Sequence, residues 1–332
     1  MKNYVGSFLQ VRGAERYVLQ GGKGEGMHFV CVRNGLGLEA WISLDRAGDV
    51  SRLTFCGDNM GYFSPCGYVA PQYYDAEGLG FLKSFTAGFF TTCGLTAVGS
   101  PCEDDGETLS LHGTVSHVPT ELMGIEENGE ALTVKLKLTD AVIFGRKLVM
   151  QRTYRFSYTE NVFSVNDTVT NEADSDSPYC ILYHCNMGWP LLSENSEVVV
   201  PNKSVQPRDE HAKDFMNTAL VMEKPQADYQ ECCYFYDVIE NNGLAKVGIY
   251  NKDISKGLVM NYDKSTLPCF TEWKMMGNKD YALGLEPGNC TPVGRDVLRK
   301  NGTLMFLKPE ESCTTAIEFK FVTDKNEFDK SF

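Results

Sequence analysis

Apolar and polar side chains alternate along much of this chain with the period of a β-strand. In residues 131–140, leucine and valine at the even positions alternate with threonine and lysine at the odd ones. This pattern is typical of an antiparallel strand with one face buried and the other in water. Residues 163–170 repeat it, and residues 148–158 form another β-prone run between these two. We therefore predict strands in all three segments.

Shorter runs of the same kind recur elsewhere, separated by Gly, Asn, Asp and Pro. They are residues 27–33, 39–43, 197–200, 244–250, 257–262, 281–285 and 314–322. The only candidate helices are short, at 209–216 and 294–300. The sequence therefore predicts an all-β protein, a sandwich or barrel. Because we find no internal repeat and no linker, we expect residues 1–332 to form a single domain.

Residues 53–98 depart from the strand pattern. They are rich in Gly, Pro and aromatic side chains and only weakly periodic. A segment of this length inside a compact protein is usually a functional loop system. We therefore expect a functional loop system here rather than a linker.

Charge and cysteine usage restrict the possible partners and compartment. The formal net charge is -13, and the 31 Lys and Arg residues are scattered, so nucleic acid and membrane surfaces are not expected partners. The first residues lack a signal-peptide pattern and no run is long enough to span a membrane, so we expect a cytoplasmic protein. The twelve cysteines show no zinc-finger spacing, and we expect them to be reduced and mostly packed as small apolar side chains. The sequence does not indicate an oligomeric state.

Two segments about a hundred residues apart carry the candidate chemistry. Residues 183–190 contain His184 and residues 283–289 contain Glu286, each near the end of a predicted strand. An imidazole and a carboxylate on opposite sides of a small substrate form a simple general acid and base pair. His112 and His117 lie in a Gly- and Pro-flanked segment, 111–119. A single histidine in such a context is more often structural, so the assignment depends on the motifs taken together.

Together the motifs resemble those of the aldose 1-epimerase, or galactose mutarotase, superfamily, and most closely its uncharacterised bacterial branch. The resemblance covers residues 46 to 307 and rests on the order and spacing of five segments. These are Phe-Thr-Thr-Cys-Gly-Leu at 90–95, Leu-His-Gly at 111–113, His-Cys-Asn-Met-Gly-Trp-Pro at 184–190, Trp-Lys-Met at 273–275 and Gly-Leu-Glu-Pro-Gly-Asn at 284–289. It implies a large antiparallel β-supersandwich with a sugar cleft, and no metal or other cofactor.

The resemblance also implies a reaction, the interconversion of the α and β anomers of a free aldose by ring opening. Glu286 would be the base that takes the proton of the anomeric hydroxyl. His184 would be the acid that gives a proton to the ring oxygen, and His112 would stabilise the developing charge. Galactose specificity does not transfer, because the substrate Asp of the well-known galactose mutarotases has no unambiguous counterpart here.

Eight further residues are predicted substrate contacts. Arginine can clamp hydroxyls with its planar fork, and tryptophan offers a flat face to a sugar ring. Each has a structural alternative, such as an ion pair in a turn or packing in the core. We place His112 rather than His117 at the substrate. The eight residues are Arg46, Asp49, Asn186, Trp189, Arg208, Glu231, Trp273 and His117.

Two other functions stay open at this point. A non-catalytic carbohydrate-binding or regulatory protein on the same fold would keep the cleft but need no proton-transfer pair. A metal-dependent sugar isomerase would use His112, His117, His184 and Glu286 as ligands, although their spacing matches no compact metal motif. Glycoside hydrolysis is disfavoured, because it usually needs two carboxylates and only Glu286 is strongly placed.

Overall fold

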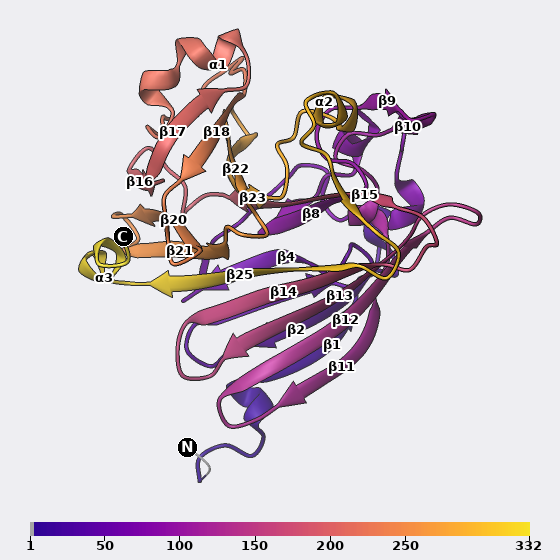
Figure 1. Ribbon diagram of the computed structural model, residues 1–332. Coiled ribbons are helices and arrows are strands. Elements are labelled where there is room, and N and C mark those ends of the chain that lie inside the picture. Colours follow the sequence, from indigo (N-terminus) through magenta and orange to yellow (C-terminus); the bar gives the residue numbers. More distant parts are fainter. Residues whose placement is uncertain (1–2) are drawn as a thin grey trace.

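A computed structural model describes residues 3–332 of the protein (Figure 1). These residues form three large antiparallel sheets and two small two-stranded ribbons. The largest has nine strands and its order is β11-β12-β13-β14-β25-β21-β20-β16, with β19 beside β20. Their bounds are β11 Glu121–Glu127, β12 Ala131–Ala141, β13 Lys147–Ser157, β14 Val162–Asn171, β16 Ser196–Val199, β19 Glu240–Asn241, β20 Leu244–Asn251, β21 Lys256–Asp263 and β25 Ser312–Val322. The predicted all-β architecture is confirmed.

The second sheet has seven strands in the order β17-β18-β22-β23-β15-β24, with β8 beside β15. Its strands are β8 Phe90–Leu95, β15 Ser177–Met187, β17 Asn202–Pro207, β18 Cys232–Val238, β22 Cys269–Met276, β23 Tyr281–Gly288 and β24 Met305–Leu307. The N-terminal sheet contains β1 Gly13–Val18, β2 His28–Arg33, β3 Leu38–Ser43, β4 Asp49–Phe55 and β5 Asp58–Asn59. Two-stranded ribbons pair β6 Tyr62–Phe63 with β7 Ala87–Gly88, and β9 Cys102–Asp104 with β10 Glu107–Leu109.

One continuous hydrophobic core is shared by all three sheets. It joins Val30 of β2, Leu136 of β12 and Leu285 of β23 in a single cluster of buried side chains. At its centre the Phe89 ring packs on Phe319, with 5.1 Å between ring centroids. The predicted strands at 131–140, 148–158 and 163–170 correspond to β12, β13 and β14, so the alternation identified the inward-facing positions correctly.

The helices are short, as predicted. They are α1 Glu210–Asp214, α2 Arg295–Lys300 and α3 Lys325–Asp329, with 3₁₀ turns η1 Phe8–Gln10, η2 Gly22–Gly24, η3 Pro71–Tyr73, η4 Gly80–Lys83, η5 Val115–His117 and η6 Met216–Thr218. Within residues 3–332, no helix has the length and apolar character needed to cross a membrane. All twelve cysteines are unpaired, and most of them are buried.

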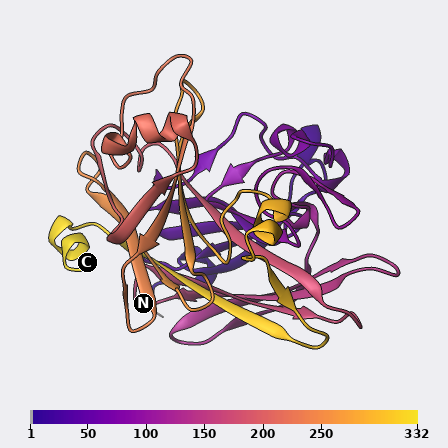
Figure 2. The same ribbon diagram turned by 45° about the horizontal axis from the view of Figure 1, so that its top comes forward.

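Two arms rise above the large sheet (Figure 2). One arm consists of β17, β18 and α1, and the other contains the loops around β9 and β10 together with α2. The space between the arms is where the candidate site lies.

Candidate active site

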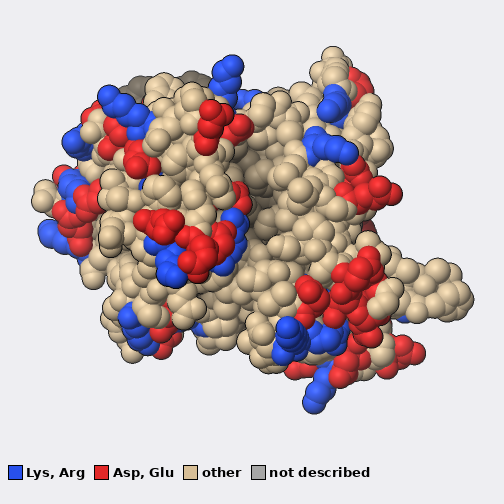
Figure 3. All heavy atoms as spheres, turned by 90° about the horizontal axis from the view of Figure 1, so that it is seen from above, with Lys and Arg blue, Asp and Glu red and all other residues tan. Residues whose placement is uncertain are grey.

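A deep cleft of about 680 Å³ opens between the two arms. Its floor is formed by β15, β22 and β23, one side by residues 208 and 231–233, and the other by loops in the ranges 62–66, 79–85 and 99–112. Figure 3 shows this hollow from above, with mostly uncharged walls and a patch of charged side chains on one lip. The segment 53–98 thus supplies much of one wall.

His184 and Glu286 face each other at the bottom of the cleft. The antiparallel register of β15 and β23 pairs Cys185 with Leu285, which places His184 directly opposite Glu286. Nδ1 of His184 lies 3.2 Å from Oε1 of Glu286. The angles are not those of a hydrogen bond, and within the described chain both atoms lack a hydrogen-bond partner. Two buried polar atoms without partners in a cleft are well suited to receive a polar ligand.

The glycine two residues before Glu286 makes room for its carboxylate. A Cβ atom on Gly284 would overlap Oε1 of Glu286 and lie 3.0 Å from Cβ of Trp273. Alternate residues of a strand share a face, so Gly284 and Glu286 both face the cleft. The sequence Gly-Leu-Glu therefore fixes where the carboxylate lies.

Replacing Gly284 with alanine is expected to displace the Glu286 carboxylate and to lower kcat/KM for the anomer exchange that the resemblance implies by about 100-fold, because small misplacements of a reacting group have effects of that order. Gly124→Ala is the matched control, since Gly124 lies in strand β11 and a Cβ there meets nothing within 4 Å. Polarimetry of both variants, with melting curves to confirm folding, provides the measurement. Full activity in Gly284→Ala would contradict this carboxylate position.

His112 and Thr271 add two more polar atoms that have no partner in residues 3–332. Nδ1 of His112 and Oγ1 of Thr271 are buried and unbonded, and both residues line the cleft. The His112 ring centroid is 5.6 Å from that of His184. Sequence reasoning missed Thr271, which pairs with Glu286 across β22 and β23. The sequence did contain a signal, because Thr271 is two residues before the predicted contact Trp273, and alternate residues of a strand share a face.

Burial favours the uncharged forms of the three ionisable groups. It lowers the pKa of His184 to about 4, although Asn186 and Glu231 act in the opposite direction. It lowers the pKa of His112 to about 3, with a further contribution from His184. Burial also raises the pKa of Glu286 well above its usual range, and the charge of Glu231 raises it further. Burial therefore favours the form of the pair in which His184 is neutral and Glu286 is protonated.

The opposite side of the cleft contains three of the predicted substrate contacts. Nη1 of Arg208 donates to Oε1 of Glu231 at 2.8 Å, and Nε1 of Trp273 donates to Oε2 of the same carboxylate at 2.6 Å. The Trp273 ring lies 5.4 Å from the His184 ring, edge to face. All three residues line the cleft, so the structure brings them together with His112, His184 and Glu286.

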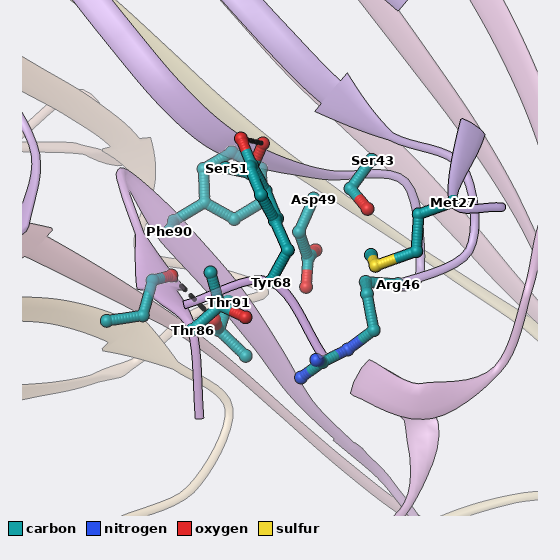
Figure 4. A pocket seen from close by; sticks show the side chains of 10 residues that line it. Met27, Ser43, Arg46, Asp49, Ser51, Tyr68, Thr86, Phe90 and Thr91 are labelled. Carbon is teal, nitrogen blue, oxygen red and sulfur yellow. Dashed lines mark hydrogen bonds between the residues drawn. The ribbon is translucent and has the colours of Figure 1, made fainter. Parts of the chain in front are cut away.

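Arg46 and Asp49 do not reach the cleft, contrary to the expectation that they clamp the sugar. Arg46 is 5% exposed and donates to the backbone carbonyls of Ser116, Val69 and Ser84. Both residues instead line a separate cavity of about 20 Å³ (Figure 4). That volume suits about one water molecule and excludes a sugar.

His117, Asn186 and Trp189 also lie outside the lining of the cleft. His117 stacks on Tyr74 and both of its ring nitrogens contact serine hydroxyls. Asn186 is fully buried and donates to the backbone carbonyl of His184, so it can support that residue rather than touch a ligand. Trp189 follows the end of β15, where the chain leaves the sheet, and is 72% exposed.

Of the four side chains considered as metal ligands, His112, His184 and Glu286 lie in the cleft and His117 lies apart from them. In the described part of the chain, no group of three or more His, Cys, Asp and Glu side chains has the arrangement needed to hold a metal ion. His117 is occupied by hydrogen bonds with serines, which separates it from the other three. The residues present therefore do not fit a divalent metal site.

Comparisons with known proteins agree with this fold. Residues 24–321 match the model of a family described as a domain of unknown function (DUF4432). A "putative aldose 1-epimerase" from Klebsiella pneumoniae superposes with a TM-score of 0.90 at 26% identity, over 96% of this chain and 85% of that one. No functionally curated protein has a significantly similar sequence.

More distant solved structures share the fold. A galactose mutarotase-like protein from Clostridium acetobutylicum gives a TM-score of 0.67 at 13% identity, over 94% of this chain and 99% of that one. Galactose 1-epimerase from Lactobacillus acidophilus gives 0.62 at 15% identity, with the same coverage of both chains. The predicted superfamily and β-supersandwich are thus confirmed.

Proposed function

The chain belongs to the DUF4432 family and has a galactose mutarotase-like fold, and from this premise we propose that it is an aldose 1-epimerase that interconverts the α and β anomers of a free sugar. The observation that carries the proposal is the pair of unpartnered, buried atoms of His184 and Glu286 on the floor of the cleft. A sugar-binding protein without catalysis needs no such pair. Opening and closing the C1–O5 bond needs only proton transfers from the protein and no change of oxidation state, so the proposed reaction requires no cofactor.

In the proposed reaction the anomeric carbon lies above the two side chains. Glu286, as the carboxylate, takes the proton of the anomeric hydroxyl, while His184, as the imidazolium, gives a proton to the ring oxygen, and the C1–O5 bond breaks. The aldehyde turns about C1–C2 and the ring closes with the proton transfers reversed. Because the proton that leaves one group is matched by one that enters the other, the pair ends with the single proton with which it began.

Hydrogen bonds from the sugar offset the cost of charging these buried groups. In the empty cleft burial favours the neutral pair, and the ion pair differs from it only by the transfer of one proton. Sugar hydroxyls can donate to the Glu286 carboxylate and accept from His184 and Thr271. Hydrogen bonds to a charged group are stronger than those between neutral groups, so bound substrate stabilises the reactive form.

The direct test is polarimetry or saturation-transfer NMR on freshly dissolved hexoses, pentoses and uronates. The protein is expected to accelerate anomer exchange of at least one of these sugars, with chelators present or absent. A protein that binds one of them but leaves the exchange rate at the buffer value would instead be a non-catalytic sugar-binding protein.

The pH profile of kcat/KM gives a second test. The rate should fall on the acid side near pH 4, because burial lowers the pKa of His184 to about 4. Protonation of His184 below that pH leaves the pair without a base. It should fall again in alkaline solution, when the pair loses its last proton. An acid limb between pH 6 and 7, as for an exposed histidine (about 6.5), would contradict the buried pair.

A further inference from the structure

The cleft is much larger than a free monosaccharide requires. A hexose fills roughly 200 Å³, about six or seven times the ~30 Å³ that one water occupies in the liquid. The cleft volume of about 680 Å³ is roughly three times that. A sugar seated on His184 and Glu286 therefore leaves most of the cleft free for another part of the substrate.

The free part of the cleft is bordered by an apolar wall. It begins at the catalytic histidines, where the Phe85 ring lies 5.2 Å from His184 and the Phe81 ring 5.3 Å from His112. It continues outward to Leu79 and Leu82, which are 61% and 53% exposed. We refer to these apolar side chains together as the apolar wall, which consists of Leu79, Phe81, Leu82, Phe85, Pro101 and Leu111.

The buried polar atoms of the cleft that lack partners in the described chain lie at its floor. The unpartnered atoms of His112, His184, Thr271 and Glu286 gather on the floor, whereas the apolar wall has no side-chain donor or acceptor. Of the neighbouring serines, Ser64 already donates to the carbonyl of Phe85. A second sugar ring placed there would lose hydration for hydroxyls with few partners, which is unfavourable. An apolar group would gain from the same burial.

The charges of the cleft disfavour an anionic substituent. Among the described residues that line the cleft, Arg208 is the one lysine or arginine. Its Nη1 is bonded to Glu231 and its Nε to Asp209. Asp280 adds another negative charge to the lining and accepts from Tyr62. A phosphate, sulfate or carboxylate on the sugar would thus meet more negative than positive charge.

From these observations we propose that the substrate is a neutral aldose carrying an aryl or alkyl group on a hydroxyl other than the anomeric one, with that group packed on the apolar wall. This inference rests on the proposed function, because it takes the position of the sugar from the proton-transfer pair. The anomeric hydroxyl stays free, as ring opening requires. The exposed leucines at the rim become covered when the substituent binds.

The test compares free hexoses with their 3-, 4- and 6-O-benzyl ethers, with glucose 6-phosphate and maltose as the anionic and two-sugar alternatives. We expect at least one benzyl ether to exceed its parent hexose in kcat/KM by about tenfold or more, the size of effect that apolar pockets give. The phosphate and maltose should show no gain. No gain for any benzyl ether, or a larger gain for the phosphate or maltose, would overturn the proposal.

Variants at the rim locate the effect. The double variant Leu79→Ser/Leu82→Ser should lose most of the ratio between benzyl ether and parent hexose. Leu36→Ser, at a leucine that is 42% exposed in the β2–β3 turn and remote from the cleft lining, should keep that ratio. A ratio that survives in the double variant would place the substituent elsewhere and overturn the assignment to the apolar wall.

Equilibrium binding measured by NMR or calorimetry separates the two proposals. If benzyl ethers bind about tenfold more tightly than hexoses but no sugar is turned over, the apolar wall is supported and the epimerase function fails. If hexoses are turned over and benzyl ethers gain nothing in binding or rate, only the substrate class fails. If the protein neither binds nor turns over any of these compounds, both fail.

Discussion

Glu286→Gln and His184→Asn are each expected to lower kcat for anomer exchange by about 10² to 10⁴, the range of a lost general acid or base. Glu286→Gln keeps the shape of the side chain, and His184→Asn keeps a smaller polar side chain in the same place. Both remove the ability to exchange a proton. The double variant should have a kcat only slightly below that of the less active single variant, because the two groups act as a unit and neither proton transfer proceeds without the other. Rates from polarimetry, divided by enzyme concentration, give the comparison.

Stability separates a chemical effect from misfolding in these variants. Within residues 3–332, Nδ1 of His184 and Oε1 of Glu286 have no hydrogen-bond partner, so the replacements break no bond at those atoms and the melting temperature should change little. Glu240→Gln, on the exposed β19 turn, is the control for a Glu-to-Gln change and should keep full activity. If either site variant retained more than a tenth of the wild-type rate, the acid and base roles would have to be reassigned.

The pairing of His184 with Glu286 was predicted from the resemblance of their motifs to the superfamily, together with their positions at strand ends marked by Gly and Pro. Period-2 alternation identified β12 and β14, and a β-prone run identified β13. The structure adds the register, which no local pattern contains. Only the alignment of Cys185 with Leu285 places the two side chains opposite each other.

Arg46 and Asp49 were misassigned because their surroundings come from distant strands. A polar Asp-Arg-Ala-Gly-Asp segment is typical of an exposed turn, and a surface turn near a cleft would suit a sugar. In the fold, the carbonyls of Val69, Ser84 and Ser116 cover Arg46, and a guanidinium from β13 reaches Asp49. Burial of a turn by other segments is a tertiary effect that local composition does not report.

The partner of Asp49 could have been recognised from the phase of its strand. Arg152 occupies an even position of β13, in phase with the buried Met150 and Tyr154. Asp167 is likewise in phase with the buried odd positions of β14, and the register pairs it directly with Arg152. Opposite charges at inward positions of neighbouring strands predict a buried ion pair. Charged residues at the buried positions of an alternating pattern, here Arg152 and Asp167, would have predicted this ion pair.

Replacing Arg152 with methionine is expected to destabilise the protein by about 3–5 kcal/mol, the usual effect of removing one partner of a buried ion pair. Arg152 is 1% exposed and binds Asp167 through Nε and Nη2, at 2.8 and 2.6 Å, and Asp49 through Nη1 at 2.8 Å. Without it two carboxylates stay buried without a cation. Urea unfolding followed by circular dichroism measures the change.

The matched control is Arg155→Met on the same strand. Arg155 is exposed on the outer face, and its loss should change the free energy of unfolding by less than about 0.5 kcal/mol. The defect of Arg152→Met should also shrink as the pH falls. Burial already raises the pKa of Asp49, and removing Arg152 raises its folded-state pKa further. Protonated Asp49 therefore contributes to stability at low pH, and this contribution is lost as the pH rises. A defect that stays constant between pH 4 and 8 would show that lost packing, and not the orphaned charge, causes the instability.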